Sequence, residues 1–245
     1  MDNVKWAVIW DLPTRIFHWL LAGGFLAAAI LALVLGDDSP LFPYHALVGL
    51  TLSLMIVLRV LWGFVGSRYA RFSSFAFGPR AVIEYMSGVL GGRGVRHTGH
   101  NPGSAWAIFA MLPFMLGLAV TGLLVAQGND GIEEIHEVLA YAMLGIVVLH
   151  ILGVLVHTLR YRENLVVSMI HGRKNVDAQA GIASSHPVVA LVFCLICGAW
   201  GFGLLAKYDP VKQTTRLPLL GISVQLGEGE DEGQTGQRED REDDD

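Results

Sequence analysis

The segment 136–157, HEVLAYAMLGIVVLHILGVLVH, is an apolar run with a histidine at each end and one in its interior. His136, His150 and His157 are separated by 14 and 7 residues, which are whole multiples of the heptad. On an α-helix the three imidazoles therefore fall on one face, within about 60° of one another. Ionisable side chains at bilayer depth are costly and usually mark a functional site. The segment predicts a membrane helix with a ligand-binding face.

The whole chain has the composition of an integral membrane protein. It is 53% hydrophobic with a mean hydropathy of +0.49, which is too apolar for a soluble protein of 245 residues. Five apolar stretches are each about 20 residues long, enough for a helix to cross a bilayer. They cover residues 17–36, 44–65, 105–126, 136–159 and 187–206. The first has no early cleavage site, so we interpret it as a retained helix. We expect an all-α fold, an integral membrane bundle of five transmembrane helices.

The charges of the connecting segments predict the orientation. Segment 66–104 carries five arginines against the single acid Glu84, and segment 160–185 is also basic, whereas the alternate loops are acidic. By the positive-inside rule, the N-terminus and both basic segments face the cytoplasm of a bacterial inner membrane, which the chain crosses several times. The pattern after Pro79 predicts an amphipathic helix along the cytoplasmic face.

The net charge of −5 conceals an acidic C-terminal end. Residues 228–245 hold ten acids and two arginines, a net charge of −8, and segment 227–245 has no apolar residue. This composition predicts a disordered tail, which lies in the periplasm if five helices span the membrane. Two interpretations stay open, a solubilising end and a docking segment for a basic partner protein.

The orientation places the histidines at two depths. His45 opens the second stretch and His136 opens the fourth, both at the outer face. His18 opens the first stretch at the cytoplasmic side, and His150 lies about 21 Å below the start of its own helix. The pairs His45–His136 and His18–His150 therefore match in depth. Paired imidazoles suggest bis-histidine iron, and hence two haems stacked across the membrane.

Three more side chains are candidates for contact with such a cofactor. His157 lies at headgroup level beside Arg160, so snorkelling or binding of a haem propionate or quinone fits it better than ligation of iron. Arg15 lies one turn before His18 and can pair with a propionate, but it can equally anchor the helix. Arg59 lies within the second stretch and needs a buried partner, a propionate or an aspartate.

Small residues lie where a flat macrocycle must approach the backbone, and ordinary packing between membrane helices explains each of them equally well. They are Gly49, Gly117, Thr121, Gly122 and Gly153.

Other chemistries fit the sequence less well. Ala140 stands where the H-E-x-x-H motif of zinc proteases needs its second histidine. Cys194 and Cys197 are followed by Gly198, so the C-x-x-C-H motif of covalent haem attachment is absent, and we interpret both cysteines as packing residues. A haem-free transporter with a histidine proton relay stays open, although interrupted helices and repeated halves are not evident.

Five segments also resemble, in order, a known family. They are WDLPTRIFHW (10–19), RVLWGFVGSRYARF (59–72), GHNP (99–102), the segment 136–157 and ENLVVSMIHGRK (163–174). These segments are similar to the b-type cytochrome subunits of nickel–iron hydrogenases and to bacterial cytochrome b561. The resemblance implies four core helices with two b haems, and His18, His45, His136 and His150 as the matching ligand positions. The family commonly has Thr at the position of His171.

The resemblance extends over residues 6 to about 175, which suggests three parts. We expect a cytochrome core over 1–175, the fifth helix with its flanks over 176–226, and the acidic tail over 227–245. The fifth helix and the tail have no counterpart in the shared core.

The resemblance further implies a quinone as one redox partner and a periplasmic protein, a hydrogenase or a c-type cytochrome, as the other. We expect an electron-transfer subunit of a respiratory oxidoreductase rather than a stand-alone enzyme, because two axial imidazoles leave iron no open position. The alternative is a self-sufficient quinone oxidoreductase with a small-molecule partner. A quinone near the cytoplasmic ends of the first and fourth stretches can exchange protons with His157, Tyr161, His97 and His100. Homo-oligomers stay open.

Overall fold

Each long apolar stretch of the sequence forms one helix in the computed structural model, which describes residues 4–92 and 95–227. The long helices are α1 (Leu12–Leu33), α2 (Pro43–Val65), α4 (Pro102–Val125), α5 (Glu133–Tyr161) and α7 (Pro187–Ala206). All five are long and apolar enough to cross a membrane. The prediction of an all-α membrane bundle with a fifth helix is therefore confirmed.

Local signals explain where the helices begin. The side chain of Asp11 accepts a hydrogen bond from the backbone N–H of Thr14, and a proline lies in the first turn, so α1 starts five residues before the apolar stretch. Asn101 caps α4 in the same way, through the N–H of Ser104. Asp11 is 1% exposed and also accepts from the indole N–H of Trp62 at 3.1 Å, which ties α1 to α2.

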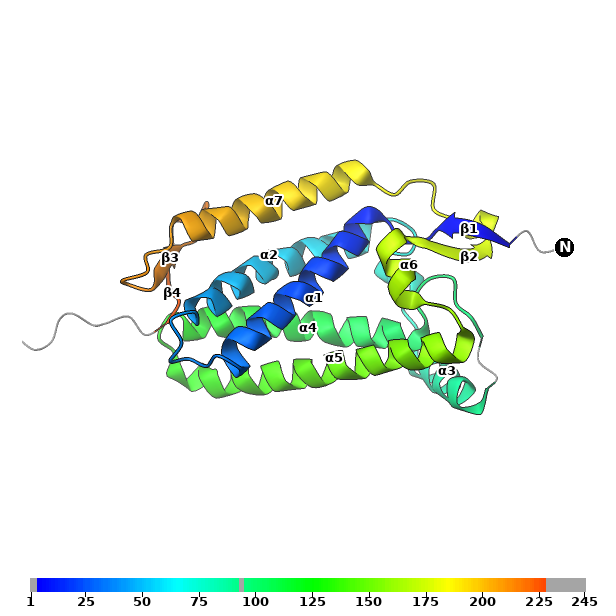
Figure 1. Ribbon diagram of the computed structural model, residues 1–245, viewed down its shortest axis with the longest axis horizontal. Helices are drawn as coiled ribbons and strands as arrows, with labels where there is room; N and C mark the ends of the chain where they lie inside the picture. The colour runs from blue at the N-terminus through cyan, green and yellow to red at the C-terminus, as the bar shows by residue number, and fades with distance from the viewer. Residues whose placement is uncertain (1–3, 93–94, 228–245) are drawn as a thin grey trace, which may run out of the picture.

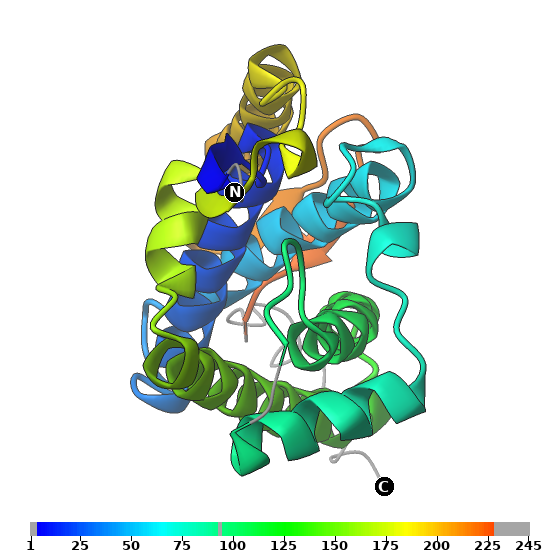
Figure 2. The same ribbon diagram turned by 90° about the vertical axis from the view of Figure 1, so that its right-hand side faces the viewer.

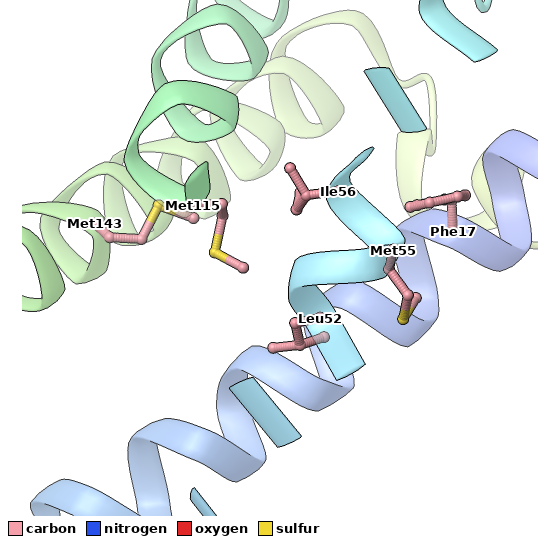
Figure 3. Close-up of a cluster of buried hydrophobic side chains, with 6 residues drawn as sticks. All are labelled: Phe17, Leu52, Met55, Ile56, Met115 and Met143. Atoms are coloured by element: carbon pink, nitrogen blue, oxygen red, sulfur yellow. The ribbon is translucent and has the colours of Figure 1, made fainter. Parts of the chain in front are cut away.

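The helices pack side by side as a bundle. In Figure 1, α7 and α5 lie on opposite sides, with α1, α2 and α4 between them. The closest packing joins α4 to α5 and α1 to α2, while α7 lies along α2 and α1. Six buried side chains from α1, α2, α4 and α5 form the central core drawn in Figure 3; they are Phe17, Leu52, Met55, Ile56, Met115 and Met143.

Two small antiparallel sheets mark the ends of the bundle. At one end, β1 (Val4–Val8) pairs with β2 (Arg173–Asp177) next to α6 (Leu165–His171), and the amphipathic helix α3 (Pro79–Gly91) lies at the same end on the opposite side, as Figures 1 and 2 show. At the other end, β3 (Thr214–Arg216) pairs with β4 (Ser223–Gln225). We call these the β1–β2 end and the β3–β4 end. Short 3-10 helices cover Phe72–Ser74, Asp130–Ile132 and Ala178–Ala180.

The amphipathic helix that the sequence predicts after Pro79 is present in the structure as α3. The β3–β4 hairpin packs over the bundle, because the backbone N–H of Gln225 donates to the carbonyl of Ala126 at the end of α4. The division of the chain at residue 175 stays a prediction, and the acidic tail from residue 228 onward lies outside the described residues.

Candidate functional site

One predicted histidine pair lies near the β3–β4 end. His45 belongs to the first turn of α2 and His136 to the first turn of α5. The centroids of their rings are 6.3 Å apart, and the ring planes are nearly perpendicular at 82°. Two imidazoles on opposite sides of one metal ion, with nitrogen–metal bonds of about 2 Å, have centroids about 6 Å apart. The fold therefore brings these rings to the spacing of a shared metal ion.

Hydrogen bonds fix the tautomer of both rings in this pair. Nδ1 of His45 lies 2.9 Å from the carbonyl oxygen of Ala28, which can only accept, so Nδ1 carries the proton. Nδ1 of His136 lies 2.8 Å from Oγ1 of Thr121. The hydroxyl of Thr121 donates its only proton to the carbonyl of Gly117 at 2.8 Å. Its oxygen therefore accepts the hydrogen bond from the Nδ1–H of His136. Both rings are thereby left with a free lone pair on Nε2, the arrangement of a metal-ligating histidine.

The small residues of the predicted site fall into two groups. A Cβ on Gly122 would lie 3.3 Å from Cε1 of His136, and one on Gly117 would lie 3.2 Å from Leu139, so both glycines allow α4 to pack against α5. Gly49 and Gly153 have no atom within 4 Å of the corresponding position. A flat macrocycle can approach the backbone at these two positions.

The second predicted pair, His18 and His150, lies toward the β1–β2 end with a third ring beside it. His18 is close enough to His150 for their charges to interact, and its Nδ1 is buried without a hydrogen-bond partner among the described residues. The third ring is His100, whose centroid is 4.6 Å from that of Trp10 and 4.6 Å from that of Phe75. Its Nε2 is likewise buried and unpartnered in the described part of the chain.

The electrostatics of His100 link it to this pair. Burial lowers the pKa of His100 to about 3, and the positive charges of Arg59 and Lys174 act in the same direction. The charges of His18 and His150 add smaller effects in the same direction, so both rings lie within electrostatic range of His100. His100 is therefore neutral at physiological pH, and it offers a buried hydrogen-bonding nitrogen rather than a charge.

Arg59 supplies a buried cation on the same side. The residue is 7% exposed, its Nη2 donates to the carbonyl of Ala70 at 3.4 Å, and its guanidinium lies 5.4 Å from the ring centroid of Phe72. Asp11 is near enough to interact with its charge. Its Nη1 has no hydrogen-bond partner within the described residues. Because a buried guanidinium with a free donor is costly, this atom fits an anionic group of a bound cofactor.

The remaining two candidates have protein partners of their own. Arg15 donates to the backbone carbonyls of Met169 and Ile170, at the end of α6. The side chain of His157 is 3% exposed and does not snorkel, because its Nδ1 meets the hydroxyl of Tyr85 and its Nε2 meets Glu163.

The residues present fit two haems. Within residues 4–92 and 95–227, no three His, Cys, Asp or Glu side chains gather as a metal site. A porphyrin supplies four nitrogens to iron and needs two from the protein, which matches histidines that come in pairs. The buried unpartnered nitrogens of His18, Arg59 and His100 also require polar partners that the described chain does not provide.

Sequence reasoning missed several polar residues of the site. Asp11 could have been recognised as a helix cap, because it precedes a proline at the start of an apolar run. In the sequence Thr121 stands out only as a small residue, and the structure adds the hydrogen bond between its hydroxyl and Nδ1 of His136. Glu163 and Lys174 lie in segments without periodicity, and nothing local in the sequence indicates that they meet.

Five long apolar helices, of which α1, α2 and α5 carry the paired histidines, define a helical bundle of an integral membrane protein. Residues 9–172, about two thirds of the chain, match the family described as Prokaryotic cytochrome b561, and the chain belongs to this family. It is therefore a b-type membrane cytochrome, and electron transfer is its class of activity. The match ends before α7 and the β3–β4 hairpin.

Curated relatives carry one description, "Probable Ni/Fe-hydrogenase B-type cytochrome subunit". The Rhizobium leguminosarum bv. viciae protein is 24% identical over 68% of this chain and 87% of its own length. The Bradyrhizobium diazoefficiens protein is 23% identical over 68% and 85%. The Escherichia coli K12 protein is 26% identical over 49% and 60%. No solved structure matches the chain.

Proposed function

We propose that this cytochrome holds two b haems and carries electrons between the quinone pool and a periplasmic redox protein. His45 and His136 would ligate an outer haem, and His18 and His150 an inner one. When bound, each haem supplies a one-electron Fe(III)/Fe(II) couple. The observation that carries the proposal is the outer pair, with rings 6.3 Å apart and a hydrogen bond on each Nδ1.

The surrounding residues would bind and orient the haems. The hydrogen bonds from Nδ1 of His45 and of His136 hold each ring in one rotation and make its Nε2 a stronger donor to metal. Arg59 would bind a propionate of the inner haem through its free Nη1, and His100 would offer a neutral hydrogen-bonding group nearby.

The expected orientation assigns the two pairs to the two sides of a bacterial inner membrane. The basic segments 66–104 and 160–185 lie at the β1–β2 end, which would face the cytoplasm with the N-terminus. The outer pair would then face the periplasm, where the descriptions of the relatives favour a nickel–iron hydrogenase as the partner. The inner pair would serve the quinone.

Spectroscopy and electron transfer on the purified protein test this proposal. We expect a reduced-minus-oxidised spectrum of low-spin haem b, haem that acidic solvent extracts, and reduction of the haem by a quinol analogue in liposomes. A hydrogenase should co-purify from mildly solubilised membranes. A preparation without a haem spectrum would refute the proposal. A quinol-reactive cytochrome without any protein partner would favour the self-sufficient quinone oxidoreductase.

A further inference from the structure

A line of buried and partly buried ionisable side chains occupies the β1–β2 end, apart from both histidine pairs. The hydroxyl of Tyr85 on α3 lies 2.9 Å from Nδ1 of His157 on α5. Nε2 of His157 lies 3.4 Å from Oε2 of Glu163, and Oε1 of Glu163 lies 2.6 Å from Nζ of Lys174. We call these four residues the Glu163 network. The proposed function assigns none of them to the binding of haem.

The Glu163 network connects solvent with the neighbourhood of the inner pair. The side chain of Glu163 is 21% exposed, whereas those of His157 and Lys174 are 3% exposed. His157 lies two helical turns from His150 along α5. On the other side, Lys174 donates to the backbone carbonyl of His97 at 2.9 Å, three residues before His100. The network therefore begins at a partly exposed carboxylate and extends to about two helical turns from His150, a proposed ligand of the inner haem.

The fold holds the network in place from several elements. Lys174 pairs with Ala7 in the β1–β2 sheet, so the N-terminal strand fixes its position. The ring of Tyr161 packs against His157 at a tilt of 43° with centroids 4.6 Å apart, and the guanidinium of Arg96 donates to the carbonyl of Tyr161. His157 is thus fixed by its neighbours, and both of its ring nitrogens have hydrogen-bond partners, Tyr85 and Glu163.

The pKa values of the groups in the network determine which of them carry a proton at neutral pH. Burial by itself would raise the pKa of Glu163, but the hydrogen bonds and charges of His157 and Lys174 outweigh it and lower the pKa to about 2. Burial raises the pKa of Tyr85 to about 12, with contributions from Tyr161 and Glu163. Glu163 is therefore a carboxylate and Tyr85 a phenol at neutral pH. Burial, Lys174 and His157 also lower the pKa of His97. The imidazole of His157 accepts from Tyr85 and donates to Glu163, a continuous hydrogen-bonded line.

We propose that the Glu163 network is a proton-exchange site that serves the quinone reaction at the inner haem. A carboxylate at the surface, an imidazole with both nitrogens engaged and a phenol form a chain along which protons can move without a charged group leaving its place. The inference rests on the proposed function, because it needs a quinone at this end of the molecule. It adds the residues through which that quinone exchanges protons with the cytoplasm.

The stoichiometry sets what the network must deliver. Conversion of one quinone to quinol takes up two electrons and two protons, and forms two O–H bonds. The inner haem, when bound, would supply the two electrons one at a time. The two protons come from cytoplasmic water through Glu163 and His157, each of which returns to its resting state after every transfer. Oxidation of quinol runs the same steps in reverse and releases both protons at Glu163.

The decisive experiment compares a proton-coupled with a proton-free oxidant on the same reduced protein. Stopped-flow spectroscopy follows the oxidation of haem by a water-soluble quinone and by ferricyanide, which accepts one electron and no proton. Glu163→Gln should slow the quinone reaction at least about tenfold. The deficit should grow from about pH 6 to about pH 8, because bulk water then supplies protons less readily. Oxidation by ferricyanide should not change.

Control variants separate proton exchange from a structural role. Glu84, an exposed carboxylate paired with Arg80 on α3, provides the matched control, and Glu84→Gln should behave as the wild type. Glu163→Asp keeps the carboxylate and should recover most of the quinone rate. The double variant Glu163→Gln with Lys174→Gln leaves no unpaired buried charge and should remain as slow as Glu163→Gln. Equal slowing of both oxidants, or an unchanged quinone rate, would overturn the inference. A wild type whose haem does not react with quinone would instead refute the proposed function.

Discussion

The hydroxyl of Thr121 offers a sharp test of the outer haem, because it acts on the iron only through His136. In Thr121→Val the side chain keeps its shape but loses the oxygen that lies 2.8 Å from Nδ1 of His136. Thr121 is 9% exposed, so water does not readily replace the lost acceptor. The Nδ1–H of His136 would then remain buried without a partner.

The expected size of the effect follows from the hydrogen bond. Loss of such a partner of a metal-ligating histidine costs about 10- to 100-fold in metal affinity. The bond is stronger when the imidazole is polarised by Fe(III) than by Fe(II), and hydrogen bonds to charged and to neutral groups differ by about 1 kcal/mol. Because 59 mV corresponds to a tenfold change for one electron, the midpoint potential of the outer haem should rise by about 40 mV.

Optical redox titration of the purified cytochrome measures this change. Thr121→Val should shift one of the two redox transitions upward and leave the other in place, while Thr121→Ser, which keeps the hydroxyl, should titrate as the wild type. Unchanged potentials in Thr121→Val, or a shift of both transitions, would refute the assignment of Thr121 to the ligand His136.

Three further perturbations probe other parts of the structure. Gly122→Ala would place a Cβ 3.3 Å from Cε1 of His136, so we expect a several-fold loss of outer haem alone, judged by haem content against the open control Gly145→Ala. Arg59→Gln removes a buried cation and should lower the inner midpoint potential, on the order of tens of mV in a redox titration, and no shift would exclude a nearby propionate. Because the pKa of Glu163 is lowered from 4.5 to about 2, its contribution to stability is complete above about pH 4.5 and disappears as the pH falls toward 2. The thermal advantage of the wild type over Glu163→Gln, followed by Soret absorbance, should shrink over that range, and a constant difference would contradict the ion pairing.

The sequence predicts the helices of this protein well, because the length and hydropathy of each stretch are local properties. The apolar run at 187–206 coincides with α7, and the boundary of α1 differs only because the cap at Asp11 lies outside the apolar run. The short strands were not predicted. Residues 173–177 become a strand only through pairing with residues 4–8, a contact between distant parts of the chain.

Less of the candidate site than of the helices could be predicted from the sequence. Depth alone was sufficient to pair His45 with His136, whose rings lie close together in the structure. Depth could not foresee that His157 is buried between Tyr85 and Glu163, since both partners come from segments outside the apolar stretches. The exposure of a polar side chain near a helix end depends on which loop covers it, and such long-range contacts leave no periodic signal in the sequence.

Haem content of four single variants tests the central claim most directly. The wild type should contain two haems b per chain, measured as pyridine haemochrome against protein. His45→Ala and His136→Ala should each lose the same haem, and His18→Ala and His150→Ala should each lose the other, as identified by midpoint potential. Loss of different haems in His45→Ala and His136→Ala, or a haem content that none of the four substitutions lowers, would contradict the account.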